Sequence, residues 1–385
     1  MAKNSPSQKI KVLHLMHTYL PEVNGVALNT YAILKELSKS GDIESIVFAP
    51  ASKRSGEIVN YDVPHKVIRY VTPPFKRFLV AVTVLAQLLR TYLRERFDVL
   101  QCHGPDQIHI GGLFRRIVPS VVTVGMFRND RMFRGSSTKQ RRLRAGLKRM
   151  DRIVSISPVI TGLLTAYDEG LRGRIVDLPL GIDLDHYRSV PAGPAAETPY
   201  ILYLGRLAGG KRVDVLLHAF SRVRQEMPGL FLHILGDGPQ RGELAALSDT
   251  LGTSENVRFF GMVTGDEKIA MLKGAALVGF PSGSGEGFPG VLLEALACDR
   301  IVVANDYETA RVVIRDGETG FIYARDNPDD MARVIVQVLK NRAQKEAEML
   351  PAIHAEVEKY DIRKIAAQYR TLYQDLVLPR PVAGR

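Results

Sequence analysis

The chain has 385 residues, which is too long for one ordinary hydrophobic core and suits two α/β domains of comparable size. Its content of 45% hydrophobic and 24% charged residues is that of a globular protein and excludes wholesale disorder. A formal net charge of +11 favours an anionic partner, such as a phosphate, a nucleic acid or an acidic membrane surface, without choosing among them.

The cysteines and the apolar runs indicate in which cellular compartment the protein is expected. Cys102 and Cys298 are far apart, so neither a disulfide framework nor a cysteine metal site is suggested. The first residues lack the apolar core of a signal peptide, and a cytoplasmic protein is therefore expected. The longest apolar run, 78–89, is shorter than the roughly 18 residues of a membrane-spanning helix. Any contact with the inner face of the cell membrane would be peripheral.

The first half of the chain alternates apolar runs with helical patterns. β-Branched runs begin at Lys11, Ser45, Lys66, Asp98, Ser120, Arg152 and Arg174. A helical pattern follows the first run and ends near Gly41, a residue type that commonly terminates helices. Strands that are apolar on both faces and alternate with helices predict a parallel, doubly wound sheet.

A break in the pattern predicts the domain boundary. Residues 189–199 are rich in Pro and Ala and have no periodicity, which is typical of a linker. Apolar runs then resume at Tyr200, Leu230, Val257, Ala276, Ile301 and Gly320. The sequence therefore predicts two Rossmann-like domains, at 1–188 and 200–350, and a helical tail at 351–385.

Two features of the first domain follow predicted strands. Asn24 and Gly25 stand between the first strand and a helix, as in a phosphate-facing loop. His103 ends the run that begins at Asp98, where a side chain faces the crevice of a doubly wound fold. A single histidine there is more often structural than catalytic, so both roles stay open.

Arg206 and Lys211 bracket a glycine-rich turn after the first strand of the second domain. Two fixed cations at this place can neutralise a diphosphate, including the charge that develops on a leaving nucleotide. Surface cations on a loop are the simpler alternative. Gly205 to Lys211 also fits the phosphate-loop pattern, but Arg212 follows where a Ser or Thr would hold Mg²⁺, so that interpretation is rejected.

Two further short patterns carry less weight. Gly236 and Gly238 follow a strand, but Arg241 replaces the third glycine of a dinucleotide fingerprint, so the pair is expected to shape a turn. Asp183 and Asp185 resemble a metal-binding pair, but no other carboxylate supports them. We expect a structural role for them and predict neither a metal nor another cofactor.

The segment 286–294, EGFPGVLLE, is the most informative. Pro289 suits the first turn of a helix, and the backbone N–H groups from Gly287 to Val291 would point beyond the end of the preceding strand. Glu286 and Glu294 can face one cleft, where carboxylates accept hydrogen bonds from the hydroxyls of a ribose and a hexose. Taken alone, either carboxylate could equally be a solvated charge or a helix cap.

Together these phrases resemble glycosyltransferase family 4, the retaining group with the GT-B fold. The resemblance covers nearly the whole chain, and its motifs appear in the family's order. They are DRIVSIS at 151–157, PLGID at 179–183, GRL and GK within 205–211, LGDGP at 235–239, EGFPGVLLEALA at 286–297 and DGETGF at 316–321.

The resemblance implies a GT-B fold, with two Rossmann-like domains facing a central cleft and the C-terminal helix crossing back to the first domain. The reaction implied is metal-independent, retaining hexosyl transfer of enzyme class 2.4, with front-face attack. The donor would be a UDP- or GDP-linked sugar and the acceptor a sugar, a small molecule or a lipid-linked or cell-envelope glycan. The base, the sugar, the acceptor and the oligomeric state are not identified.

The resemblance also implies roles for individual residues. Donor diphosphate contacts fall to Arg206, Lys211, Asn24 and Gly25, and ribose contacts to Glu294. The transferred sugar would meet His103 and Glu286 at the reacting centre, with contacts from Gly287, Phe288, Gly290 and Val291.

Two loops depart from the family pattern. Residues 305–310, NDYETA, replace a common Gly-Gly loop on the donor side. Residues 125–133, GMFRNDRMF, replace a phrase that commonly contains histidine, on the presumed acceptor side.

Two basic segments could explain the high net charge. The segment 139–149 is a cationic helical pattern that could bind an anionic membrane or acceptor, whereas the apolar segment 76–96 is expected to be an ordinary helix of the fold.

Two functions other than glycosyl transfer are considered. One rival function is a nucleotide-sugar epimerase or hydrolase on the same fold. The other is a non-enzymatic protein that binds anionic ligands; a nucleic-acid-binding module lacks any recognition motif here.

Overall fold

The chain folds into two compact units. The computed structural model describes residues 9–22, 25–51, 63–72, 77–128, 133, 136–193, 198–283 and 287–377. Unit 1 comprises Met1–Gly181 and Ile362–Arg385, and unit 2 comprises Ile182–Asp361. None of the helices in these ranges is long and apolar enough to cross a membrane.

Unit 1 is built on a parallel sheet of seven strands in the order β3-β2-β1-β4-β5-β6-β7. The strands are β1 Ile10–Leu15, β2 Ile43–Pro50, β3 Lys66–Tyr70, β4 Val99–His103, β5 Val122–Phe127, β6 Arg152–Ser155 and β7 Ile175–Asp177. The strand order reverses between β1 and β4, which makes their carboxyl ends the switch point of the sheet. The predicted doubly wound architecture is confirmed.

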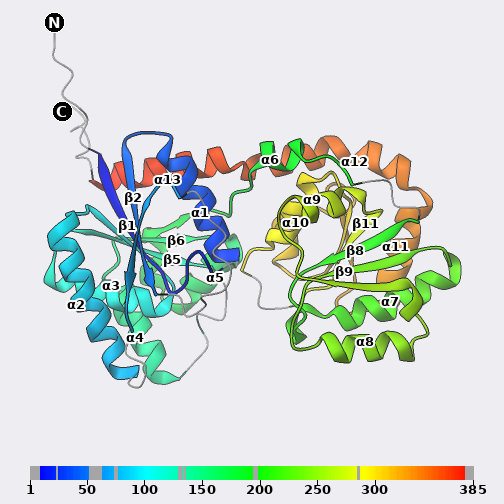
Figure 1. The fold of residues 1–385 in the computed structure, drawn as a ribbon, viewed down its shortest axis with the longest axis horizontal. Helices are drawn as coiled ribbons and strands as arrows, with labels where there is room; N and C mark the ends of the chain where they lie inside the picture. Colours follow the sequence, from blue (N-terminus) through cyan, green and yellow to red (C-terminus); the bar gives the residue numbers. More distant parts are fainter. Residues whose placement is uncertain are drawn as a thin grey trace, which may run out of the picture. The chain divides into compact units, whose positions relative to one another are not determined.

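Helices cover both faces of this sheet (Figure 1). They are α1 Gly25–Ser38, α2 Arg77–Glu95, α3 Pro105–Ile117, α4 Ser137–Leu147, α5 Pro158–Tyr167 and α13 Ile362–Val377. On β4, Cys102 faces α3 so closely that Gly111 has no room for a Cβ atom. The neighbouring His103 faces the other side, where α1 and α13 pack against each other.

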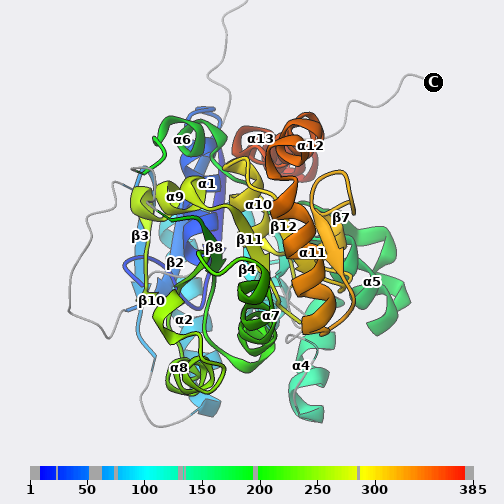
Figure 2. The same ribbon diagram turned by 90° about the vertical axis from the view of Figure 1, so that its right-hand side faces the viewer.

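Unit 2 repeats the architecture with a parallel sheet in the order β10-β9-β8-β11-β12-β13. Its strands are β8 Tyr200–Leu204, β9 Phe231–Leu235, β10 Val257–Gly261, β11 Leu277–Phe280, β12 Val302–Asn305 and β13 Phe321–Tyr323. Its helices are α6 Leu184–Ser189, α7 Val213–Glu226, α8 Arg241–Thr250, α9 Gly265–Gly274, α10 Gly290–Ala297, α11 Pro328–Lys340 and α12 Arg342–Val357. Helix α11 packs on β12 and against α7 (Figure 2).

The division of the chain falls earlier than the predicted linker at 189–199. Helix α6 precedes that linker but belongs to unit 2, because its buried Leu184 and Tyr187 pack toward α10. At the other end, α12 stays with unit 2, whereas α13 packs on α1 and β1 of unit 1. The composition of 189–199 does not report this packing, which depends on contacts between distant parts of the chain.

Local sequence signals set several helix ends. Gly41 has a φ of 75° shortly after α1, as expected for a residue that ends a helix. Ser157 accepts a hydrogen bond from the Ile160 amide and caps α5, and Pro158 occupies the first turn. Asn327 caps α11 in the same way.

Candidate functional site

In unit 1, His103 lies at the carboxyl end of β4, at the switch point of the sheet. It is 3% exposed, and its Nε2 lies 3.3 Å from Nδ1 of His14 on β1. Burial, together with the nearby Arg128 and His14, holds the pKa of His103 well below its usual value. The ring is therefore neutral at physiological pH and can accept or donate a hydrogen bond.

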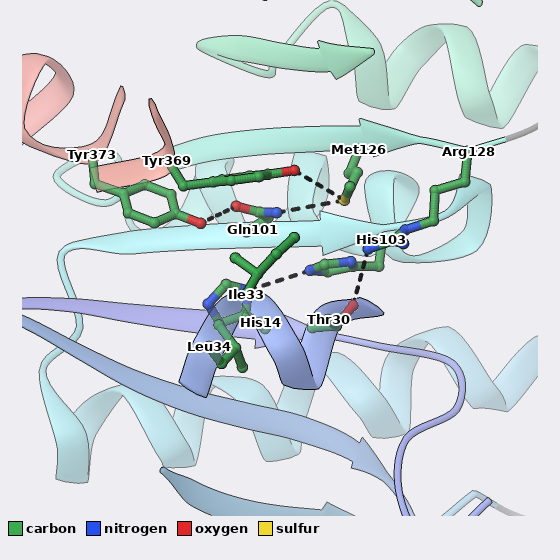
Figure 3. Close-up of a pocket in the computed structure, with 10 residues that line it drawn as sticks. All are labelled: His14, Thr30, Ile33, Leu34, Gln101, His103, Met126, Arg128, Tyr369 and Tyr373. Atoms are coloured by element: carbon green, nitrogen blue, oxygen red, sulfur yellow. Dashed lines mark hydrogen bonds between the residues drawn. The ribbon is translucent and has the colours of Figure 1, made fainter. Parts of the chain in front are cut away.

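Polar side chains from the sheet, α1 and α13 line the pocket around this histidine pair, together with the apolar Ile33, Leu34 and Met126 (Figure 3). The Tyr373 hydroxyl donates to Gln101 Oε1 at 2.5 Å, and the Gln101 amide faces the sulfur of Met126 at 3.6 Å. At the end of β5, Arg128 donates to Thr30 Oγ1 at 2.9 Å. Burial lowers the pKa of Arg128 to about 10, so it remains charged.

The predicted phosphate loop after β1 is described in part. Gly25 is exposed at the first position of α1, and a Cβ atom added to it would meet no described atom within 4 Å. The position is therefore open to a ligand at a helix N-terminus. Asn24 lies outside the described residues.

In unit 2, the loops that follow β8, β9, β11 and β12 are joined at the carboxyl edge of the sheet. Leu207 exchanges backbone hydrogen bonds with the loop after β9, donating to Asp237 and accepting from Gln240 at 3.0 and 3.1 Å. Gly283, after β11, donates to Gly210 at 3.0 Å. The strand order reverses between β8 and β11, so this edge is the switch point where ligands of such sheets bind.

The glycines after β9 allow two loops to touch backbone to backbone. A Cβ atom on Gly236 would overlap the carbonyl oxygen of Gly205. One on Gly238 would overlap the carbonyl oxygen of Leu207 and lie 2.8 Å from its nitrogen. The prediction that this glycine pair shapes a turn is confirmed.

Gly238→Ala is expected to destabilise the protein by about 1–3 kcal/mol, because a backbone segment must move to admit the methyl group. The segment that moves carries Arg206, so donor affinity should fall as well. Urea unfolding and donor titration check both effects. Gly242→Ala, in α8 with no described atom within 4 Å of the added Cβ, is the control and should be neutral or slightly stabilising. Equal free energies of unfolding for the two variants would contradict the close backbone contact between Gly238 and Leu207.

The two predicted diphosphate cations emerge beside this edge. Arg206 is exposed directly after β8, and Lys211 is half-buried before α7. Next to them, Arg212 has a left-handed φ of 50° and pairs with Asp326 at 2.9 Å. Asp326 also accepts hydrogen bonds from the Tyr307 hydroxyl and the Asn305 amide at 3.1 and 2.8 Å. The unusual loop at 305–310 is thus tied to the segment that carries Lys211.

Glu294 lies on α10 within an ionic cluster. Its Oε2 is 2.8 Å from Lys268 Nζ of α9, with the two side chains 25% and 19% exposed. This contact is an ion pair without hydrogen-bond alignment, since Oε2 has no hydrogen-bond partner among the described residues. Lys268 donates instead to the Tyr187 hydroxyl of α6 at 3.2 Å. Burial and then the Glu294 carboxylate raise the pKa of Tyr187 well above its usual value. A fixed, acceptor-rich carboxylate suits a ligand with vicinal hydroxyls.

The start of α10 differs in detail from the predicted row of free amides. The helix begins at Gly290, and Pro289 is its cap residue. The Gly290 amide donates to the Phe288 carbonyl at 3.0 Å, so it is already engaged in a tight turn. The Phe288 side chain is buried edge-on against Tyr360, with ring centroids 5.5 Å apart. Gly287 is buried, Val291 is half-buried in the first turn, and Glu286 lies outside the described residues.

Asp183 serves a structural role. Its Oδ1 accepts a hydrogen bond from the His186 amide at 3.1 Å and caps α6. This cap accounts for Asp183, the first of the two aspartates that resemble a metal-binding pair.

Sequence patterns missed three residues of these two clusters. Lys268 and Tyr187 reach Glu294 from helices far away in the chain, so no local spacing could reveal them. His14 had a signal, because a histidine inside a strand that is apolar on both faces must be buried.

The sequence was compared with models of known protein families and with known proteins. The family model "Glycosyltransferase Family 4" matches residues 23–186, and "Glycosyl transferases group 1" matches residues 190–352. A phosphatidyl-myo-inositol mannosyltransferase of Mycobacterium tuberculosis is 30% identical over 297 residues, which cover 72% of this chain and 74% of the relative.

Solved structures agree on the fold. The Anabaena protein HepE in complex with UDP matches with a TM-score of 0.81 at 18% identity, covering 95% of this chain and all of that one. Sucrose-phosphate synthase from Thermosynechococcus elongatus matches with a TM-score of 0.80 at 17% identity, covering 96% and 99%. The predicted GT-B fold is confirmed.

Proposed function

Because the chain belongs to glycosyltransferase family 4, whose enzymes use nucleotide-sugar donors, we propose that it is a retaining, metal-independent enzyme with a UDP- or GDP-linked donor. The observation that carries this proposal is the carboxyl edge of the unit 2 sheet, from which Arg206 and Lys211 emerge. HepE is solved in complex with UDP on the same fold, which supports a UDP-linked donor, and the mycobacterial relative is named as a mannosyltransferase, which supports transfer of a hexose.

In this mechanism each group has one task. Glu294 accepts hydrogen bonds from the ribose hydroxyls, and Arg206 and Lys211 neutralise the charge that develops on the leaving diphosphate. The bond from the sugar C1 to the phosphate oxygen breaks while the acceptor oxygen bonds to C1 on the same face. The acceptor's proton passes to the leaving phosphate oxygen. His103, as a neutral ring, hydrogen-bonds the transferred sugar.

The donor can be identified by thermal-shift measurements with UDP-, GDP-, ADP- and dTDP-sugars. We expect a UDP- or GDP-sugar to raise the melting temperature in the presence of EDTA. No shift with any nucleotide sugar, or a shift that needs a divalent metal, would contradict the proposal. Turnover of the donor into an isomeric nucleotide sugar without an acceptor would favour an epimerase instead.

Glu294→Ala is expected to weaken donor binding about 10- to 100-fold, because hydrogen bonds from hydroxyls to a carboxylate are lost and Lys268 keeps an unpaired charge. Calorimetric titration with the donor measures the change. Glu348→Ala, which removes an exposed carboxylate on α12, is the matched control. Wild-type affinity in the Glu294 variant would remove this residue from the donor site.

We also propose that the acceptor is lipid-linked and that α4 binds an anionic membrane. Five cations on or just after this helix are exposed, and the helix has no acidic residue: Lys139, Arg141, Arg142, Arg144 and Lys148. The mycobacterial relative is named for a phospholipid substrate, which supports a membrane-borne acceptor. Helix α2 is the weaker candidate, since it packs on α3 and buries Val84 and Leu88.

Reversing two of these charges should reduce membrane binding. Each surface cation contributes about 1 kcal/mol, so Arg141→Glu with Arg142→Glu should weaken binding to anionic liposomes at least about 30-fold at low salt. Lys340→Glu with Lys345→Glu makes the same charge change on unit 2 and is the control. Equal binding of both variants, or no liposome binding by the active wild type, would contradict this surface.

A further inference from the structure

The histidine pair of unit 1 contains a residue that the proposed mechanism does not use. His14 is 2% exposed on β1, and its Nδ1 lies 3.3 Å from Nε2 of His103 (Figure 3). We propose that His14 is a positioning residue that fixes the ring orientation and the tautomer of His103. This inference rests on the proposed role of His103 at the transferred sugar.

The hydrogen bond between the rings couples their protonation patterns. Two neutral imidazoles can share only one hydrogen between their facing nitrogens, because each ring carries one N–H. If His14 donates, His103 must carry its own hydrogen on Nδ1; if His14 accepts, Nδ1 of His103 is a lone-pair acceptor. Which nitrogen of His14 is protonated therefore decides whether His103 offers a donor or an acceptor to a ligand.

The surroundings keep both rings neutral and give His14 a fixed place. Burial, with His65 and Arg128 nearby, lowers the pKa of His14 to about 3. Tyr373 of α13 packs edge-on against the His14 ring, with centroids 6.4 Å apart, and Ile33 and Leu34 of α1 line the same pocket.

The polar side chains next to the histidine pair form hydrogen bonds with other residues. Gln101 is bonded to Tyr373, and Arg128 donates to Thr30. The outer nitrogens of the pair, His103 Nδ1 and His14 Nε2, are buried and have no hydrogen-bond partner among the described residues. Such orphaned nitrogens cost free energy, and a purely structural histidine pair would be expected to satisfy them. On His103, the orphan is the atom that a sugar oxygen would satisfy.

Substitutions at His14 separate positioning from packing. His14→Leu removes the hydrogen bond, His14→Asn keeps a polar atom near the place of Nδ1, and His14→Gln moves the amide toward the place of Nε2. We expect His14→Leu and His14→Gln to lower kcat about tenfold with donor KM within about twofold, and His14→Asn to recover most of kcat. Adding His14→Leu to His103→Ala should cause no further loss, because the effect acts through His103.

Nitrogen-15 NMR of the histidine rings gives a readout that packing alone would not move. We expect one tautomer of His103 in the wild type and in His14→Asn, and a mixture of tautomers in His14→Leu and His14→Gln. Wild-type kcat and an unchanged His103 spectrum in folded His14→Leu would overturn the proposal. So would an additive loss in the double variant, or equal activity of the Asn and Gln variants. Full activity of His103→Ala alone would instead refute the proposed role of His103.

Discussion

His103→Ala is expected to lower turnover about 100-fold while leaving the donor KM close to that of the wild type. The reason is that the neutral ring at the end of β4 is proposed to bind the sugar where charge develops in the transition state, whereas the proposed nucleotide and diphosphate contacts come from unit 2. Steady-state kinetics with saturating acceptor measures both constants.

The control for this prediction is His109→Ala, which removes a half-buried histidine on α3. It should retain nearly full activity. A loss in His103→Ala that appears mainly in donor KM would mean that His103 contributes to ground-state binding only. Unchanged kcat and KM would remove it from the reaction.

Acidification from pH 7 to pH 5 is expected to destabilise unit 1 by about 2 kcal/mol through His14 alone. The folded pKa of this residue is about 3 and its ordinary value is 6.5, so the unfolded chain binds the proton more tightly. The contribution of His14 to the free energy of unfolding is therefore fully present above pH 6.5, and it is lost as the pH falls from 6.5 toward about 3. His103 shifts in the same direction and adds to the loss.

The test compares urea unfolding at pH 7, 6 and 5 for the wild type and His14→Asn, followed by probes in unit 1. Because asparagine does not titrate, the variant should lose about 2 kcal/mol of the pH dependence. Equal pH dependence in the wild type and His14→Asn would contradict the burial of an uncharged His14.

Much of the fold was predictable from the sequence because its signals are local. Apolar runs from Lys11 and from Tyr200 each begin a parallel sheet; Gly41 marks the end of a helix by its backbone conformation, and Ser157 marks the start of one by its side-chain cap. The boundary between the units was not predictable in this way. It depends on how Leu184 and Tyr187 pack against distant parts of unit 2, which composition does not report.

In the candidate site, too, local signals were predictable from the sequence and tertiary contacts were not. The places of Arg206, Lys211 and Glu294 in the fold could be predicted because strand ends and helix starts fix where such residues lie, whereas their roles stay predictions. Their immediate partners could not, because Lys268 meets Glu294 and Asp326 meets Arg212 only through tertiary packing. Arg212 also adopts a left-handed conformation that no local propensity favours. Family membership then decides between the rival functions in favour of a glycosyltransferase.

The proposed retaining, metal-independent chemistry is tested most directly by proton NMR of donor hydrolysis in EDTA, which needs no acceptor. The anomeric configuration of the released sugar is read before mutarotation equilibrates it. The proposal predicts the same configuration as in the donor, at a rate that EDTA does not change. Release of the opposite anomer, or loss of hydrolysis when divalent metals are removed, would contradict it.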